Sequence, residues 1–242
     1  MTIKYWLNNA QNEKYFIEQL NNPKESTKYI FEIFKKKKLN NLNTLDLACG
    51  NGANLIFLKK QFKNEKYCLG LDINKNLLKQ GSNFNNFNDL ELKYGNVLNL
   101  SKKLKNKFQL ITSFQTLSWL KDYQKASIEM IKLNSKYIFI SSLFWEGLID
   151  FNIKLDLLKN DKPNRQVLKS KYYNIYSLKN FLNFYKKYNY KKILCEKFEI
   201  KKNLRNNFKE GMGTYTIKDK GKNIQISGPL LMNWYSIIFK KL

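Results

Sequence analysis

One stretch of thirteen residues, 43–55, limits the fold of this chain more than any other part of the sequence. It begins with a short apolar run that holds a single acid, Asp46, and continues into a turn that holds Gly50 and Gly52. Glycines permit a sharp bend and remove side chains where a ligand must approach the backbone closely. An apolar helical run begins directly after the turn. The pattern predicts a buried strand, a glycine turn and a helix start, which together aim backbone N–H groups at a nucleotide-like ligand.

The spacing within this turn distinguishes two kinds of nucleotide site. The dinucleotide-binding fingerprint needs a third glycine three residues after Gly52, and Leu55 stands there. Asp46 places a carboxylate near the strand end, where it would repel a pyrophosphate and attract an ammonium group, such as the one that S-adenosylmethionine carries. The motif resembles the first motif, D-x-A/G-x-G-x-G, of class I S-adenosylmethionine-dependent methyltransferases, and reads here Asp46-Leu47-Ala48-Cys49-Gly50-Asn51-Gly52.

The resemblance implies S-adenosylmethionine as cofactor and extends to the next two predicted strands. Asp72 ends an apolar run twenty-six residues after Asp46, the distance of one βαβ unit, and is expected to accept hydrogen bonds from the ribose hydroxyls. Asn96 stands where the family has an acid, so its amide is a weaker acceptor for the adenine amine. The expected cofactor-binding residues are Asp46, Ala48, Gly50, Asn51, Gly52, Asp72, Ile73, Gly95, Asn96, Val97, Phe114 and Gln115.

Apolar runs that alternate with helical patterns predict an α/β fold with a doubly wound, mostly parallel sheet. The resemblance makes this the seven-stranded, Rossmann-like methyltransferase sheet, with N-terminal helices and a C-terminal hairpin. We expect one domain, because no linker composition interrupts the 242 residues. Its parts are an N-terminal helical lid (1–40), a cofactor-binding core (41–142), an acceptor-selecting insertion (143–176), and a segment that completes the sheet and carries the hairpin arm (177–242).

Three local expectations are specific. Pro23 is expected within the first turn of the second helix, since proline suits that position. Residues 143–175 break the alternating pattern and are expected to form an insertion over the strand ends. Residues 230–239 are expected to form one closing strand, preceded by a hairpin that pairs residues 214–217 with 223–226.

The chemistry of transfer depends on what the acceptor needs. The chain has no histidine, so a sugar hydroxyl would need a carboxylate such as Glu146 or Asp150, or a tyrosine, as base. An anionic oxygen needs only positioning, which favours an anionic acceptor. The resemblance implies that the loop with Gln115 and Trp119 lies beside the transferred methyl group; Trp119 fits a core position equally well, and Glu146 fits an exposed loop. Gln115 and Glu146 are the candidate catalytic residues, and Trp6, Trp119, Arg165, Tyr172 and Tyr173 the candidate acceptor-binding residues.

Charge and cysteine content narrow the alternatives. The formal net charge is +25, yet Arg165 and Arg205 are the only arginines among 44 basic residues, and a dedicated nucleic-acid reader favours arginine. We therefore interpret most lysines as solvated and as the product of an AT-rich genome. Three cysteines without a C-x-x-C spacing, and no histidine, predict free thiols and no metal site. The chain lacks a membrane-spanning apolar stretch, which predicts a cytoplasmic protein.

The predicted function is O-methylation of a small polar or anionic acceptor. The C-terminal stretches 211–216 and 227–231 are loosely similar to methyltransferases among polysaccharide-modifying enzymes, which implies a sugar, nucleotide-sugar or phosphoramidate of a surface polysaccharide or capsule. One alternative is an RNA or protein methyltransferase, which the charge favours but which lacks an Asn-Pro-Pro-Tyr-type motif. Another is a methyltransferase-like subunit that binds a partner without catalysis. The acceptor and the oligomeric state stay open.

Overall fold

The computed structural model describes residues 9–158, 167–205, 214–227 and 230–242. Seven strands form one sheet in the order β3-β2-β1-β4-β5-β13-β9, and the short β8 (Tyr176–Ser177) pairs with the end of β5. Neighbouring strands from β3 to β5 are parallel, whereas β13 is antiparallel to both of its neighbours. The predicted doubly wound, mostly parallel sheet of seven strands is thus confirmed. The strands are β1 (Thr44–Leu47), β2 (Cys68–Asp72), β3 (Leu90–Tyr94), β4 (Leu110–Phe114), β5 (Tyr137–Trp145), β9 (Tyr190–Lys197) and β13 (Trp234–Lys241).

Helices cover both faces of this sheet. On one face, α2 buries Ile30, Ile33 and Phe34, which follow the three- and four-residue spacing of one helix side, and Phe34 meets Phe139 edge-on. On the other face, α5 and α6 bury Met130, Phe181 and Tyr185 against the sheet. The helices are α1 (Asn9–Asn21), α2 (Glu25–Lys36), α3 (Ala53–Phe62), α4 (Lys75–Phe84), α5 (Gln124–Lys132) and α6 (Leu178–Lys187), with 3₁₀ turns η1 (Lys102–Leu104) and η2 (Leu117–Trp119).

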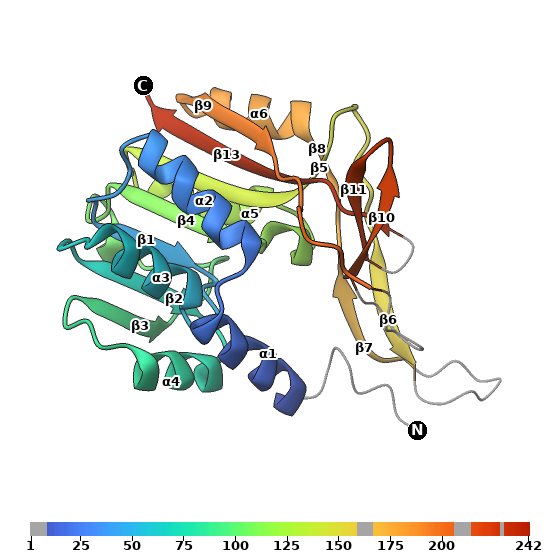
Figure 1. Ribbon diagram of the computed structural model, residues 1–242. Coiled ribbons are helices and arrows are strands. Elements are labelled where there is room, and N and C mark those ends of the chain that lie inside the picture. Colours follow the sequence, from blue (N-terminus) through green and yellow to red (C-terminus); the bar gives the residue numbers. More distant parts are fainter. Residues whose placement is uncertain (1–8, 159–166, 206–213, 228–229) are drawn as a thin grey trace.

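Two small antiparallel units lie beyond the sheet, on the side toward which β1 points (Figure 1). One is the hairpin of β6 (Lys154–Leu158) and β7 (Val167–Tyr172), and the other contains β10 (Thr214–Asp219), β11 (Lys222–Ser227) and β12 (Leu230–Leu231). Buried side chains of Leu143, Tyr173, Met232 and Trp234 form one apolar cluster that ties these units to the sheet. The carboxyl ends of the parallel strands therefore face a separate β layer.

The local expectations are confirmed in part. The hairpin of residues 214–217 with 223–226 forms, with Ile217 opposite Ile224. Pro23 does not lie in the first turn of α2, because Lys24 is the N-cap and the helix begins at Glu25. The expected closing strand 230–239 is wrong in extent: it divides into β12 and β13. Within the expected insertion, the leucine-rich part pairs as the β6–β7 hairpin.

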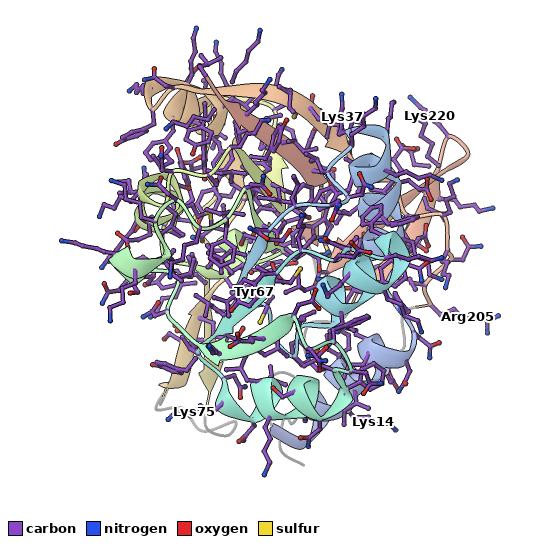
Figure 2. All side chains as sticks on the ribbon, turned by 90° about the vertical axis from the view of Figure 1, so that its left-hand side faces the viewer. Lys14, Lys37, Tyr67, Lys75, Arg205 and Lys220 are labelled. Atoms are coloured by element: carbon purple, nitrogen blue, oxygen red, sulfur yellow. The ribbon has the colours of Figure 1, made fainter. Side chains whose placement is uncertain are left out.

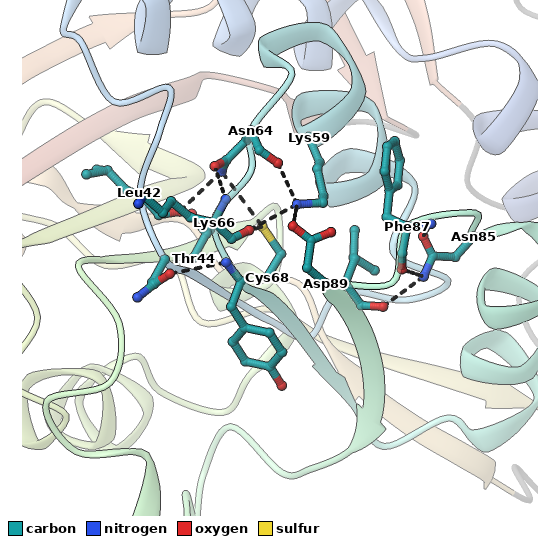
Figure 3. Close-up of polar contacts among 12 residues, drawn as sticks. Leu42, Thr44, Lys59, Asn64, Lys66, Cys68, Asn85, Phe87 and Asp89 are labelled. Atoms are coloured by element: carbon teal, nitrogen blue, oxygen red, sulfur yellow. Dashed lines mark hydrogen bonds and ion pairs between the residues drawn. The ribbon is translucent and has the colours of Figure 1, made fainter.

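A buried lysine holds the amino ends of two parallel strands in place (Figure 3). Lys59 of α3 is 3% exposed, and its ammonium group donates to the carbonyl oxygens of Asn64 (2.6 Å) and Lys66 (3.0 Å). It also forms an ion pair with Asp89, at 2.7 Å. All three ammonium hydrogens thus have acceptors, which offsets the cost of burying the charge. Lys59 therefore anchors the start of β2 and β3 to α3, away from the glycine turn.

Across the described residues, every helix is too short or too polar to cross a lipid bilayer.

Candidate functional site

The glycine turn between β1 and α3 adopts left-handed backbone conformations at three positions. The φ angles are +56° at Ala48, +61° at Gly50 and +76° at Gly52, the N-cap residue of α3. Only the two glycines adopt such angles without steric cost, so the strain at Ala48 marks a turn that its surroundings hold in place. The Gly50 N–H donates to the Asp72 carboxylate at 2.8 Å. The turn is therefore fastened to the end of β2.

Asp72 is the second carboxylate of this site. Its side chain is 9% exposed, and it accepts one N–H from Gly50 and one from Asn74, each at 2.8 Å and each on a different oxygen. Burial raises the pKa of Asp72, whereas these N–H bonds lower it. A carboxylate oxygen accepts two hydrogen bonds, so each oxygen can take one more donor. Asp72 thus holds two turns together and can still accept hydrogen bonds from a ligand.

Asp46 is fully buried within β1. Its Oδ1 accepts a hydrogen bond from the Thr112 hydroxyl at 2.8 Å, and Thr112 is the residue opposite Asp46 on β4. Its Oδ2 has no hydrogen-bond partner among the described residues. Burial, with a smaller contribution from the charge of Asp72, raises the pKa of Asp46 to about 8. A cation bound beside it would favour the ionised form of Asp46, so this orphaned oxygen is suited to a cationic group of a ligand.

The residues that follow β2 and β3 include both polar and apolar side chains. Gly95 donates its N–H to the Asp72 carbonyl oxygen at 3.0 Å, which places this segment beside the second carboxylate. The Asn96 side chain is exposed and its oxygen accepts from the Leu98 N–H at 2.9 Å, which leaves its amide nitrogen available as a donor among the described residues. Ile73, directly after Asp72, is 64% exposed, whereas Val97 is buried. An open apolar side chain beside an open amide suits a flat heteroaromatic ligand.

The loop after β4 is the second strained part of the site. Gln115 has a φ angle of +55°, and its N–H donates to the Ser141 carbonyl oxygen at 2.8 Å. Its side-chain oxygen accepts from the Lys24 ammonium at 3.4 Å. Phe114 is buried against Phe139 of β5. The strain at Gln115, like that at Ala48, lies at a strand end on the site side of the sheet.

Trp119 lies in η2, half-buried, and its ring packs on that of Tyr173 with centroids 4.6 Å apart. Tyr173 is 2% exposed and belongs to the apolar cluster below the β layer, and burial raises its pKa. Tyr172, at the end of β7, is half-buried. Tyr173 of the insertion therefore meets the β4 loop, which brings two of the sequence-predicted acceptor residues, Trp119 and Tyr173, together.

Helix α1 contributes to the site in a way that the sequence pattern did not reveal. The Asn51 side chain donates to the Phe16 carbonyl oxygen at 2.7 Å. A Cβ atom on Gly50 would lie 2.8 Å from the Phe16 ring, so the absence of that atom makes room for α1 as well as for the turn. Neighbouring Tyr15 stands edge-on to Phe16, and the Lys24 ammonium lies 5.1 Å from the centre of the Tyr15 ring.

The remaining sequence-predicted residues lie elsewhere. Glu146 is exposed, and its carboxylate accepts a hydrogen bond from the Tyr235 hydroxyl of β13. Asp150 accepts from the Ser177 N–H at 2.5 Å. Within the part of the chain that the structure describes, no hydrogen bond or ion pair joins either carboxylate to the glycine turn. Trp6 and Arg165 lie outside the described residues.

Comparison with known proteins identifies the kind of domain that carries this arrangement. The family model named methyltransferase domain matches residues 38–210. No curated protein matches the sequence. Solved structures show the same fold at low identity. An S-adenosylmethionine-dependent methyltransferase from Clostridium acetobutylicum has 16% identity and a TM-score of 0.57, with 96% of this chain and 99% of that chain covered.

Two further solved structures illustrate how widely the fold is used. A candidate RNA methyltransferase from Pyrococcus horikoshii has 10% identity and a TM-score of 0.55, over 94% of this chain and 90% of that chain. A candidate sarcosine dimethylglycine methyltransferase from Galdieria sulphuraria has 15% identity and a TM-score of 0.52, over 71% of this chain. This chain spans only 62% of the Galdieria protein. At such identities the likeness shows the fold and leaves the acceptor undecided.

Proposed function

This chain belongs to the methyltransferase domain family, with S-adenosylmethionine as its cofactor, and we propose that it methylates an oxygen atom of a small, polar, anionic acceptor. The reaction class rests on the family, whereas the acceptor rests on the chemistry of this chain. The observation that carries the proposal is the complete absence of histidine from the 242 residues, together with the location of the candidate carboxylate bases.

The residues of the glycine turn fit the proposed cofactor. The orphaned, fully buried Oδ2 of Asp46 is suited to hold the ammonium group of the methionine half. Asp72 has one acceptor position left on each oxygen and is suited to the two ribose hydroxyls. Gly95, Asn96 and Val97, with exposed Ile73, are suited to the adenine ring. Ala48, Asn51 and Phe114 shape the backbone around these contacts.

The β layer is proposed to hold the acceptor. Parallel sheets of this kind bind ligands outside the carboxyl ends of their strands, and both antiparallel units lie on that side (Figure 1). Trp119, Tyr172 and Tyr173 are the acceptor-side residues that the structure describes, and the hairpin of β6 and β7 is proposed to select the acceptor. Helices α1 and α2 are proposed to cover the cofactor. The chain would then consist of a lid (1–40), a cofactor-binding core (41–142), an acceptor-selecting insertion (143–176) and a segment that completes the sheet (177–242).

Bound S-adenosylmethionine supplies an electrophilic methyl group. The protein then has to align the acceptor oxygen with that methyl group and exclude water, and it needs a base only where the oxygen carries a proton. Gln115 at the β4 strand end is proposed to position the reacting groups. Glu146 shares its carboxylate with the Tyr235 hydroxyl and has no described bond to the glycine turn. An oxygen that is already anionic makes a base unnecessary.

A sugar phosphate, nucleotide-sugar or phosphoramidate of a surface polysaccharide meets this requirement. The pathway itself rests on the loose similarity of the C-terminal stretches, which fall partly outside the described residues. An acceptor screen that includes these compounds tests the assignment to this pathway.

RNA is the second candidate acceptor, because the formal charge of +25 favours phosphate-rich partners. The basic side chains, however, do not follow one track: Lys37 and Lys220 lie at one end of the view in Figure 2, and Lys14 and Lys75 at the opposite end. A dispersed charge favours non-specific attraction over a built nucleic-acid groove. A screen with nucleotide-sugars, glycans and RNA on equal terms separates the two candidates.

A single-turnover pH profile tests the anionic acceptor, once the screen has yielded a substrate. With saturating cofactor, the rate should be nearly flat between about pH 6.5 and 9 in the wild type and in Glu146→Gln, because no base has to titrate. Asp150→Asn serves as the matched control for loss of a loop carboxylate. A rate that rises with pH and falls about 10²- to 10⁴-fold only in Glu146→Gln would refute the proposal and make Glu146 the base.

A further inference from the structure

Lys24 is a half-buried cation in the site for which neither the motif nor the family match gives a role. It is the N-cap residue of α2, and its ammonium group lies 3.4 Å from the Gln115 side-chain oxygen and 5.1 Å from the centre of the Tyr15 ring. No carboxylate oxygen among the described residues lies within ion-pair distance of it. The neighbouring Glu25 carboxylate accepts from the Lys201 N–H at 2.5 Å through Oε1, and its Oε2 is buried without a hydrogen-bond partner among the described residues.

Three contacts made by Lys24 and its neighbours on α2 place the start of this helix beside both the glycine turn and the β4 loop. Thr27, one helical turn after Lys24, donates to the Asn54 side chain at 2.6 Å, and Asn54 stands two residues after Gly52. Tyr15, whose ring receives the ammonium, precedes Phe16, whose ring lies against Gly50. The β4 loop supplies the third contact through Gln115. The start of α2 is therefore held between both strained segments of the site.

A cation without a carboxylate partner has donors to spare. A lysine ammonium has three N–H donors, and here one makes a long bond to a neutral amide while a ring face offers only a weak attraction. Most of the other lysines whose burial the structure describes are exposed, where water satisfies them. A half-buried ammonium that faces a strained loop is instead suited to an anionic oxygen of a ligand, because such a bond is stronger than either present contact.

We propose that Lys24 binds the carboxylate of the methionine half of S-adenosylmethionine, opposite Asp46, which takes the ammonium of the same amino-acid group. The inference rests on the proposed cofactor site. An α-amino acid is a zwitterion, so its recognition calls for one negative and one positive side chain a short way apart. Asp46 pairs with Thr112 on β4, and Gln115 follows Thr112 by three residues on the same strand and loop. Both charges are therefore tied to β4.

The second source of an anionic oxygen in this site is the acceptor itself. The observations favour the cofactor, because the contacts of Lys24 lead to the glycine turn through Thr27 and Tyr15, whereas none of its described contacts is to the β layer. An acceptor anion held by Lys24 is the competing outcome of the test below.

The test is calorimetric binding of three ligands to Lys24→Met: S-adenosylmethionine, S-adenosylhomocysteine and decarboxylated S-adenosylmethionine, which lacks only the carboxylate. Loss of a charge-assisted bond should weaken the first two about 10- to 100-fold, and the third less than about 3-fold. Lys28→Met is the matched control, since Lys28 is exposed on the same helix and should bind all three like the wild type. Lys24→Arg keeps the charge and should stay within about 5-fold of the wild type.

Three results would overturn the inference. Equal weakening of the carboxylate-bearing and decarboxylated ligands would mean that Lys24 only supports the fold of the site. Unchanged affinity for S-adenosylmethionine would exclude the cofactor carboxylate. A further NMR measurement would then assign Lys24 to the acceptor. In the complex with S-adenosylhomocysteine, methyl phosphate would shift the Gln115 side-chain amide signal of the wild type but not that of Lys24→Met. A wild-type protein that binds none of the three ligands would refute the proposed cofactor site as well.

Discussion

Replacement of Asp46 by asparagine should stabilise the fold and weaken the cofactor site at the same time. In the wild type, burial raises the pKa of Asp46 from the ordinary value of 3.8 to about 8. Between these two values the unfolded chain has lost a proton that the folded chain keeps, so the stability of the wild type falls as the pH rises. An asparagine has no proton to lose, and its oxygen can still accept the Thr112 hydrogen bond.

The size of the effect follows from the gap between the two pKa values. At about 1.4 kcal/mol per pH unit, this gap lowers the free energy of unfolding of the wild type by about 6 kcal/mol between low pH and pH values above 8. The buried amide N–H₂ of asparagine takes the place of the orphaned Oδ2 and costs about 1–3 kcal/mol. Asp46→Asn should therefore match the wild type near pH 5 and exceed it by about 3–5 kcal/mol at pH 9.

Urea unfolding of both proteins between pH 5 and 9 measures this difference, with the exposed Asp219→Asn as control. Calorimetry on the same samples should show S-adenosylmethionine bound about 10- to 100-fold more weakly by Asp46→Asn, because an ammonium group loses its carboxylate. A stability difference that does not change between pH 5 and 8 would refute the raised pKa of Asp46. Undiminished affinity would refute its role toward the ammonium.

Three further substitutions test other parts of the structure. Asp72→Asn should weaken S-adenosylmethionine binding about 10- to 100-fold in calorimetry, since one oxygen that can serve the ribose becomes a donor, and full affinity would refute the ribose assignment. Gly50→Val should abolish binding and lower unfolding stability by about 1–3 kcal/mol, because its φ is +61° and its Cβ would meet Phe16; retained binding would show that the ligand lies elsewhere. Lys59→Met should lower the free energy of unfolding in urea by about 1–3 kcal/mol, because the carbonyl oxygens of Asn64 and Lys66 lose their donor, whereas Lys60→Met, which is exposed, should change it little; similar small losses in both would contradict the buried anchor.

The sequence could predict the sheet because its signals are local. The runs that hold Asp46 and Asp72 are short, apolar and bounded by turn residues, and each became a buried strand. The hairpin at residues 214–226 was likewise predictable from its alternation and its turn. The division of residues 230–239 was not, because nothing in that apolar stretch marks where β12 leaves the β layer and β13 enters the sheet.

The site was less predictable, because several of its contacts join segments far apart in the chain. Thr112 reaches Asp46 only through the pairing of β1 with β4, and Lys24 reaches Gln115 across 91 positions. A single lysine after a proline carries no sequence signal in a chain so rich in lysine. The hydrogen bond between Glu146 and Tyr235 was equally unpredictable, because the position of Glu146 in a loop after β5 does not indicate a partner on β13.

A crystal structure of the protein with S-adenosylhomocysteine is the most direct test of the cofactor site. The nucleoside should lie over the turn of Gly50 and Gly52, with both ribose hydroxyls within hydrogen-bond distance of Asp72. The adenine should lie between Ile73 and Asn96, and the amino group should meet Oδ2 of Asp46. Ligand density in any other place, or a ribose without contact to Asp72, would refute the proposed cofactor site.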